Sequence, residues 1–178
     1  MKKAVFWDRD GVINKAILRN NKVFSPRELK DFEIVPGVRK ILAECRQQGY
    51  LNIVITNQPD ISRGLMSRDI LDSMHRIIQE QLCVDDIFVC PHDDQDQCTC
   101  RKPKPGMMID AAQKWGIDLR ASFVVGDQWK DVDAGKNSGC STILLSSCYN
   151  QGVAADFIID EISSAADIIA GHGKGRLT

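Results

Sequence analysis

Short apolar runs alternate along the chain with stretches that repeat apolar residues every three or four positions. A continuous apolar run predicts a buried strand, whereas the three-to-four spacing predicts an amphipathic helix. The predicted strands cover residues 3–7, 51–55, 86–89, 122–125, 142–145 and 157–159. The predicted helices cover residues 38–48, 67–82, 107–115, 131–137 and 162–170. Strands that alternate with helices indicate βαβ units, so the sequence predicts an α/β fold in three layers with a mostly parallel central sheet.

Polar side chains stand where three of the predicted strands end. They are Asp8 and Asp10 after the first strand, Thr56 and Asn57 after the second, and Asp127 after the fourth. In an open parallel sheet, ligands bind at the carboxyl ends of the strands. We therefore expect these side chains to meet in one crevice, although they lie far apart in the sequence.

The two aspartates after the first strand suggest chemistry on phosphate. Two close carboxylates repel each other unless a cation lies between them, and Asp8, Asp10 and Asp127 would offer the oxygen ligands that Mg²⁺ prefers. One aspartate could then attack phosphorus and form an aspartyl phosphate. Its neighbour could protonate the leaving oxygen and later take a proton from water. The other interpretation is that residues 8–11 are an ordinary polar turn after a strand.

Four motifs, in this order and on the expected elements, resemble those of the haloacid dehalogenase (HAD) superfamily, most of whose members are phosphatases. They are Asp8-x-Asp10-Gly11, Thr56 at a strand end, Lys102, and Gly126-Asp127-x-x-x-Asp131. The resemblance implies a Rossmann-like HAD fold with Asp8 as the nucleophile and Asp10 as the acid and base. It also implies that Thr56 and Lys102 stabilise the phosphoryl group, and that Asp131 supports the magnesium site from behind its direct ligands.

A second cluster lies within one short loop and consists of Cys90, His92, Cys98 and Cys100. Three thiolates and one imidazole make a closed tetrahedral set, which is typical of structural Zn²⁺. Four protein ligands leave no open position for an activated water, so we assign no catalysis to this ion. We expect it to hold rigid the loop that presents Arg101 and Lys102. The alternatives are reduced thiols without a metal, or a disulfide among them.

The cysteine-rich segment narrows the resemblance to two related families. The segment 90–107 and the segment 8–14 resemble those of the D-glycero-D-manno-heptose 1,7-bisphosphate phosphatases and of the histidinol-phosphate phosphatases. The first family implies removal of one phosphate from a heptose bisphosphate in the synthesis of precursors of surface polysaccharide, such as lipopolysaccharide or capsule. Five residues are assigned to substrate binding on this basis: Arg9, Asn57, Gln58, Arg63 and Arg101. A guanidinium could bind a second phosphate with two parallel hydrogen bonds.

Two departures keep other functions open. Only five residues separate the Cys-x-His and Cys-x-Cys pairs, which is more typical of the histidinol-phosphate phosphatases, and Gln128 stands where many relatives carry a lysine. Histidinol-phosphate phosphatase is therefore the alternative among hydrolases. Transfer of phosphate to a sugar acceptor is a third possibility. A catalytically silent, zinc-stabilised binding module is a fourth, although such a module would need neither Asp8 nor Asp10.

The length of the chain suits a single domain over residues 1–170, followed by a flexible tail over residues 171–178. The stretch between Asp10 and Thr56 is too short for an inserted cap domain, because a predicted helix already occupies part of it. Selectivity would then come from three loops, namely residues 15–31, residues 58–66 and the cysteine-rich loop. The sequence therefore predicts a HAD fold without a cap.

Composition and charge exclude several classes of function. The 178 residues include 23 basic and 24 acidic side chains, so no strong positive field would attract nucleic acid or an anionic membrane. The apolar runs are too short to span a bilayer, and the N-terminus lacks the pattern of a signal peptide. Seven cysteines, an odd number, argue against a disulfide framework. We expect a cytoplasmic monomer that acts on a small phosphorylated sugar and binds neither nucleic acid nor a membrane.

Overall fold

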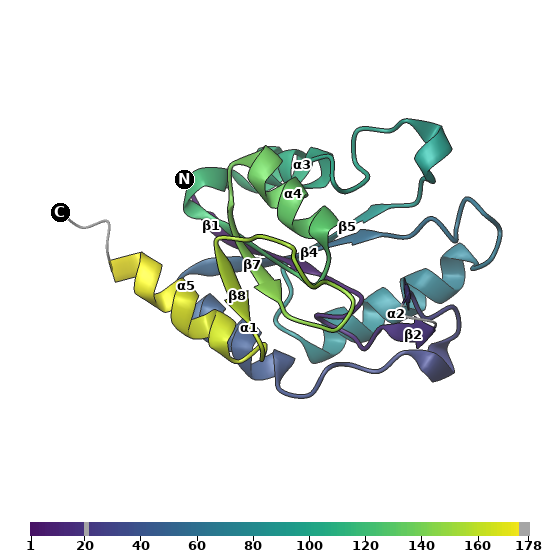
Figure 1. The fold of residues 1–178 in the computed structure, drawn as a ribbon, viewed down its shortest axis with the longest axis horizontal. Coiled ribbons are helices and arrows are strands. Elements are labelled where there is room, and N and C mark those ends of the chain that lie inside the picture. The colour runs from purple at the N-terminus through teal and green to yellow at the C-terminus, as the bar shows by residue number, and fades with distance from the viewer. Residues whose placement is uncertain (20–21, 175–178) are drawn as a thin grey trace.

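A parallel sheet of six strands forms the centre of the molecule in the computed structural model, which describes residues 1–19 and 22–174 (Figure 1). The strand order is β5-β4-β1-β6-β7-β8, and every neighbouring pair is parallel. The strands are β1 (Lys3–Asp8), β4 (Tyr50–Asn57), β5 (Asp86–Cys90), β6 (Phe123–Gly126), β7 (Ser141–Leu145) and β8 (Phe157–Ile159). All six strands expected from the apolar runs are present, which confirms the predicted α/β fold.

Helices cover both faces of this sheet and make three layers (Figure 1). One face carries α1 (Val38–Gln47), α2 (Arg68–Gln81) and α5 (Ser164–Lys174), and the other carries α3 (Gly106–Trp115) and α4 (Trp129–Ser138). Successive side chains of a strand point to opposite faces. In β1, Val5 and Trp7 therefore join the core under α1, while Ala4 and Phe6 join the core under α3. No helix among the described residues is long and apolar enough to cross a membrane.

The fold departs from expectation in two segments. The predicted loop over residues 15–31 contains an antiparallel hairpin of β2 (Ile17–Arg19) and β3 (Lys22–Phe24), followed by the short 3₁₀ helix η1 (Leu29–Asp31). These strands have only three residues each, too few for a clear apolar pattern. Helix α5 continues to Lys174, beyond the expected helix end at residue 170. The last four residues of the predicted tail, 175–178, lie outside the described residues.

Strand register determines which side chains meet at the carboxyl edge of the sheet. Strand β1 lies between β4 and β6, so the residues that end these three strands are neighbours in space. Asn57, the last residue of β4, pairs with Cys90, the last residue of β5. The cysteine-rich loop therefore starts directly beside the polar end of β4.

Candidate active site

A buried lysine bridges two carboxylates at the carboxyl edge of the sheet. The Lys102 Nζ atom lies 2.5 Å from Asp8 Oδ1 and 2.7 Å from Asp131 Oδ1, and all three side chains are buried. Burial alone would lower the pKa of Lys102, but the charges of Asp131 and Asp8 outweigh it and raise this pKa above its usual value. Lys102 therefore stays protonated beside the predicted nucleophile.

A third carboxylate completes this group. Oxygens of Asp8, Asp127 and Asp131 all lie within 4.8 Å of one another. Burial and the charge of Asp131 raise the pKa of Asp8 well above its usual value, although Lys102 opposes the shift. The same two causes raise the pKa of Asp127 to about 7, while the hydrogen bond from Tyr149 opposes the shift. Three carboxylates thus face one ammonium group, an arrangement that repels itself without a further cation.

The oxygens of this group fit a hard divalent cation. The Tyr149 hydroxyl donates a hydrogen bond to Asp127 Oδ2 at 2.5 Å. In contrast, Asp127 Oδ1 is buried and has no hydrogen-bond partner among the residues that the structure describes. Buried polar atoms are nearly always paired, and Mg²⁺ or Ca²⁺ binds such carboxylate oxygens. The structure therefore supplies a place for the predicted ion, with an unpaired oxygen ready to bind it.

Glycine is required at position 11 for the loop after β1 to reach this group. Gly11 has a φ of +99°, in the region that side chains other than glycine rarely adopt. A Cβ atom here would lie only 2.1 Å from Asp127 Oδ2. The glycine thus permits both the turn and the close approach of the loop to Asp127.

Asp10 lies outside the group of three carboxylates and has different partners. Its carboxylate accepts hydrogen bonds from Arg9 Nη2 at 2.9 and 3.0 Å, Asn14 Nδ2 at 2.9 Å, Ser25 Oγ at 2.8 Å and Gln58 Nε2 at 2.7 Å. Burial raises the pKa of Asp10, but the charge of Arg9 and the hydrogen bond from Asn14 bring it below its usual value. The sequence analysis expects Asp10 among the metal ligands and Asp131 behind them; in this structure the oxygens that lie close to Asp8 and Asp127 come from Asp131.

The end of β4 connects these parts. Gln58 Nε2 donates hydrogen bonds to Thr56 Oγ1 at 2.8 Å and to Asp10 Oδ2 at 2.7 Å. The Asn57 side chain makes two hydrogen bonds of 3.0 Å with the backbone of Lys102, one to its carbonyl oxygen and one from its N–H. Residues 56–58 therefore hold both Asp10 and the lysine loop against the end of the sheet.

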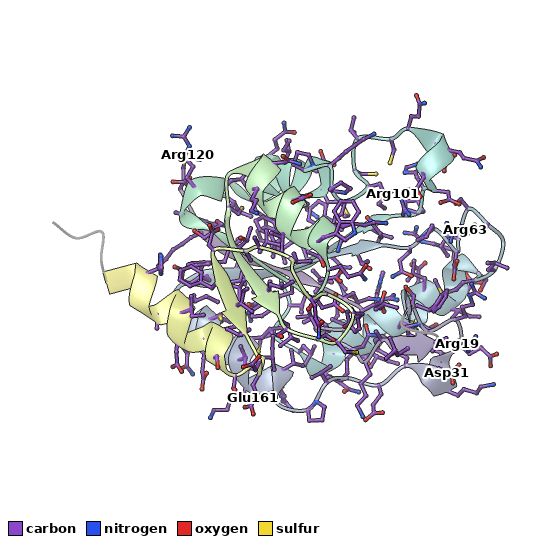
Figure 2. All side chains as sticks on the ribbon, in the orientation of Figure 1. Arg19, Asp31, Arg63, Arg101, Arg120 and Glu161 are labelled. Carbon is purple, nitrogen blue, oxygen red and sulfur yellow. The ribbon has the colours of Figure 1, made fainter. Side chains whose placement is uncertain are left out.

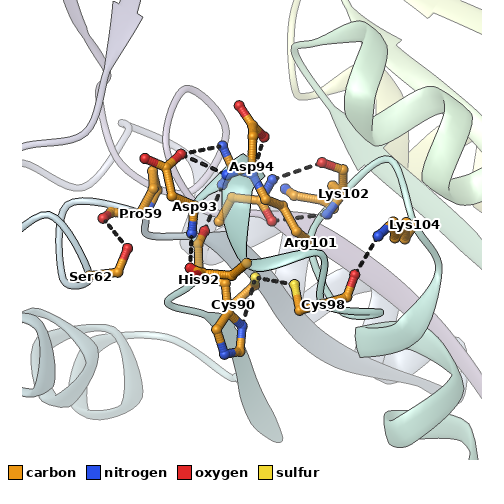
Figure 3. Close-up of polar contacts among 12 residues, drawn as sticks. Pro59, Ser62, Cys90, His92, Asp93, Asp94, Cys98, Arg101, Lys102 and Lys104 are labelled. Carbon is orange, nitrogen blue, oxygen red and sulfur yellow. Dashed lines mark hydrogen bonds and ion pairs between the residues drawn. The ribbon is translucent and has the colours of Figure 1, made fainter.

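The cysteine-rich loop forms a second cluster of possible metal ligands (Figure 3). The sulfur of Cys98 lies 3.6 Å from that of Cys90 and 3.5 Å from that of Cys100, and His92 Nδ1 lies 3.7 and 3.4 Å from Cys90 and Cys100. A tetrahedral zinc ion would place sulfurs about 3.8 Å apart, and sulfur and nitrogen about 3.6 Å apart. The loop geometry therefore fits a tetrahedral ion. All seven cysteines are free in this structure, and the sulfurs of the cluster lie 3.5 Å or more apart, farther than the roughly 2.05 Å of a disulfide bond.

A cavity of about 290 Å³ opens above the buried carboxylates. Asp8, Thr56 and Lys102 line it, as do Arg63 and Arg101. Figure 2 shows Arg63 and Arg101 on the same side of the molecule, remote from Arg120. The cavity therefore joins the predicted catalytic groups to the two arginines expected to bind substrate.

Known proteins with the same features identify the family. A family model described as HAD-hydrolase-like matches residues 99–165. The D-glycero-beta-D-manno-heptose-1,7-bisphosphate 7-phosphatase of Pasteurella multocida is 32% identical, and the alignment covers 96% of this chain and 98% of that protein. The chain belongs to the heptose-bisphosphate phosphatase family. The D-glycero-alpha-D-manno-heptose-1,7-bisphosphate 7-phosphatase of Mycobacterium bovis is also 32% identical, over 97% of this chain and 93% of that protein.

Solved structures of heptose-bisphosphate phosphatases share the fold. The D,D-heptose 1.7-bisphosphate phosphatase from B. bronchiseptica, complexed with magnesium and phosphate, matches with a TM-score of 0.81 at 28% identity. The match covers 95% of this chain and 98% of that chain. The predicted HAD fold and the predicted family are thereby confirmed.

Two residues expected to bind substrate have other places in this member of the heptose-bisphosphate phosphatase family. Arg9 and Gln58 are fully buried, and neither is among the described residues that line the cavity. Both direct their side-chain N–H groups at Asp10 instead. In this structure both residues therefore support an aspartate, and their contact with substrate stays a prediction. Asn57 does line the cavity.

Sequence reasoning missed several polar side chains of this heptose-bisphosphate phosphatase site. Asn14 and Ser25 bind Asp10, and Tyr149 binds Asp127. His75 lies behind Arg9, with its Nε2 atom 3.4 Å from Arg9 Nη1. Asn14 is the last residue of the segment 8–14 that carries the family resemblance, so the sequence already pointed to it. The other three come from distant segments without a motif, so only the fold reveals them.

Proposed function

We propose that the protein is a Mg²⁺-dependent D-glycero-D-manno-heptose 1,7-bisphosphate 7-phosphatase that works through an aspartyl phosphate. The observation that carries this proposal is the buried group of Asp8, Asp127 and Asp131 around Lys102, with an unpaired oxygen on Asp127. Such a group has no evident use in a silent binding module. Membership of the heptose-bisphosphate phosphatase family supports the choice of substrate.

In this mechanism, Asp8 attacks phosphorus and forms a new P–O bond, while the bond from phosphorus to the sugar oxygen breaks. Lys102 and the Thr56 hydroxyl stabilise charge on the phosphoryl oxygens. Asp10 protonates the leaving oxygen and later takes a proton from the water that hydrolyses the aspartyl phosphate. Bound at Asp8 and Asp127, Mg²⁺ would neutralise negative charge on the phosphate.

Asp10 must change its protonation state to act as the acid. In this structure its carboxylate accepts hydrogen bonds from Arg9, Asn14, Ser25 and Gln58, which favour the ionised form. An incoming phosphate brings negative charge close to Asp10, and a nearby negative charge raises the pKa of a carboxyl group. Substrate binding thus prepares Asp10 to carry the proton.

We also propose that the cysteine-rich loop holds Zn²⁺ in a structural role. The distances among Cys90, His92, Cys98 and Cys100 support a tetrahedral ion, and four protein ligands close the site to water. Free cysteines throughout the chain fit a reducing compartment such as the cytoplasm. Precursors of lipopolysaccharide or capsule are the expected destination of the heptose product.

Phosphate release from both anomers of heptose 1,7-bisphosphate, measured beside histidinol phosphate, tests this function. Relatives named for the alpha and for the beta anomer are both similar to this chain, so both anomers belong in the assay. We expect Mg²⁺-dependent release from a heptose bisphosphate and little from histidinol phosphate. A preference for histidinol phosphate would overturn the choice of substrate.

Replacement of the nucleophile tests the covalent mechanism. The Asp8→Asn variant keeps the size of the side chain but loses the attacking oxygen charge, so phosphate release should fall by at least about 10³-fold. Unchanged release from Asp8→Asn would overturn the aspartyl phosphate. Added acceptor alcohols serve as a second arm, because phosphate found on the alcohol would indicate transfer rather than hydrolysis.

A further inference from the structure

The two arginines at the mouth of the cavity are already held by acidic side chains. Arg63 makes two hydrogen bonds of 2.6 Å to the two carboxylate oxygens of Asp93. Arg101 Nε donates to Asp94 Oδ1 at 2.7 Å, and Arg101 Nη2 lies 3.9 Å from Asp93 Oδ1 (Figure 3). We call Asp93 and Asp94 the acidic turn. Each of the two arginines expected to bind a second phosphate is thus paired with a carboxylate where that phosphate is expected to bind.

The cysteine-rich loop fixes the acidic turn in position. The turn follows His92 directly, and the His92 carbonyl accepts a hydrogen bond of 3.2 Å from Arg101 Nη1. The Asp93 N–H donates to Asp96 Oδ2 at 2.7 Å, and the Asp94 N–H donates to Asp93 Oδ1 at 2.8 Å. These contacts cap the short 3₁₀ helix η2 (Asp94–Asp96). The carboxylates are therefore presented to the arginines by an ordered turn.

At the mouth of the cavity, carboxylates balance the charge of the arginines even without a bound substrate. Asp60 is buried and lies 2.6 Å from Arg27 Nε and 3.5 Å from Arg63 Nη1. Together with the acidic turn, it sets three carboxylates against Arg27, Arg63 and Arg101. A second phosphate that takes the bidentate position on Arg63 and the Nε position on Arg101 must displace the acidic turn.

We propose that Asp93 and Asp94 are specificity-determining residues, which occupy Arg63 and Arg101 until the second phosphate of the substrate takes their place. The inference rests on the proposed function. Carboxylate and phosphate bind a guanidinium fork in the same bidentate way, so a phosphate dianion can replace the carboxylate. A substrate with a neutral group at this position cannot make the exchange, and the arginines then contribute nothing to its binding.

Steady-state kinetics of Asp93→Asn and Asp94→Asn test the exchange. The asparagine keeps an oxygen that can accept the capping hydrogen bond but loses the charge that competes for the arginine. KM for heptose 1,7-bisphosphate should fall about two- to fivefold, the range expected for a partly exposed ion pair. KM for p-nitrophenyl phosphate, which has no second phosphate, should not change. Asp110→Asn, an exposed position on α3 outside the cavity lining, is the matched control for lost charge.

A double-mutant cycle with Arg63→Ala distinguishes replacement of the Asp93 carboxylate on Arg63 by phosphate from a general attraction of the substrate by the loss of negative charge. If Asp93 acts by occupying Arg63, Asp93→Asn has no further effect in the Arg63→Ala background. A raised KM for the bisphosphate in Asp93→Asn, equal changes for both substrates, or an effect that persists without Arg63 would each overturn the inference. Zinc content and Tm verify that each variant is folded. If the unaltered protein does not hydrolyse heptose bisphosphate, the proposed function itself fails, and the inference fails with it.

Discussion

Asp8 and Asp10 are two residues apart in the sequence but have opposite electrostatic surroundings. Burial and the neighbouring carboxylates raise the pKa of Asp8 despite Lys102, whereas the charge of Arg9 and several hydrogen-bond donors outweigh burial and lower the pKa of Asp10. A metal ion and a phosphate would reverse both conditions, because the first adds positive charge near Asp8 and the second adds negative charge near Asp10. The resting site is therefore arranged for a cation on one side and an anion on the other.

Gly11→Ala should separate the effect of backbone strain from that of contact with Asp127. The left-handed φ alone costs about 1–2 kcal/mol of stability for a residue with a side chain. The new Cβ atom also meets Asp127 Oδ2, so phosphate release should fall by at least about tenfold. Gly49→Ala is the matched control, since Gly49 has a similar φ of +82° and open space around it. Retained activity in Gly11→Ala would contradict the assigned role.

His75 should act on Asp10 through Arg9. Burial and the charge of Arg9 lower the pKa of His75 to about 4, so the ring is neutral at pH 7 and its Nε2 atom can accept from Arg9. His75→Leu removes this acceptor from a fully buried guanidinium, which should cost about 1–3 kcal/mol of stability. We expect kcat to fall more than KM changes. His75→Gln retains an acceptor and should restore kcat, and equal loss in both variants would argue for packing alone.

At the scale of elements, the sequence predicted the strands far better than the loops. Continuous apolar runs identified the six strands of the sheet, because burial on both faces leaves a strong pattern. The hairpin of β2 and β3 left no such signal, yet it ends at Phe24, beside Ser25, whose hydroxyl binds Asp10. The ion pairs between the acidic turn and the two arginines of the cavity were also beyond sequence reasoning. Arg63 lies 30 residues away from Asp93, and only the fold brings the two together.

Loss of the proposed zinc ion from the cysteine-rich loop should affect the mouth of the cavity more than its floor. Cys98→Ser removes one of the four proposed zinc ligands, so zinc content should fall and stability should drop by about 2–4 kcal/mol. KM for heptose 1,7-bisphosphate should rise severalfold because Arg101 and the acidic turn lose their support. Hydrolysis of p-nitrophenyl phosphate should change less, since Asp8 and Thr56 lie at strand ends. Equal losses for both substrates would contradict this division, and Cys148→Ser at an exposed cysteine is the control.

At the scale of the whole molecule, the catalytic group combines residues from three strand ends, one helix and one loop. Motif order predicted which residues would gather, and the parallel sheet explains why Asp8, Thr56 and Asp127 do so. The sequence could not predict which carboxylates face one another. That depends on the position of α4, which places Asp131 between Lys102 and the end of β6.

Magnesium should stabilise the protein more at pH 8 than at pH 5.5. Without metal, the folded pKa of Asp127 is about 7, above its usual value of 3.8. Between pH 3.8 and about pH 7, the folded state therefore binds more protons than the unfolded state. The free energy of unfolding falls as the pH rises over this range. Magnesium competes with that proton. At about 100-fold excess over its Kd, it should add about 2.7 kcal/mol, measured as a shift in Tm.

At each pH, Tm is measured with and without magnesium, and the difference is taken. Groups remote from the site change both Tm values equally, so their titration does not affect this difference. Asp127→Asn carries no charge to titrate at this position, so the difference between the two pH values should become smaller, and the part that remains reports Asp8, whose pKa is also raised. A magnesium shift that is the same at both pH values in the unaltered protein would contradict a role for Asp127 in binding the ion.

The pairing of Asn57 with Cys90 marks the boundary between the strand ends of the sheet and the excursion of residues 91–101, two parts that can evolve separately. Strand ends supply Asp8 and Thr56 to the reactive floor of the cavity, while a single excursion after β5, residues 91–101, supplies Asp94 and Arg101 to its charged mouth. Insertions or replacements in that excursion would alter the accepted sugar without disturbing the nucleophile. Grafting this excursion from one phosphatase to another is therefore a route to exchange substrate preference between them, with the reaction itself left intact.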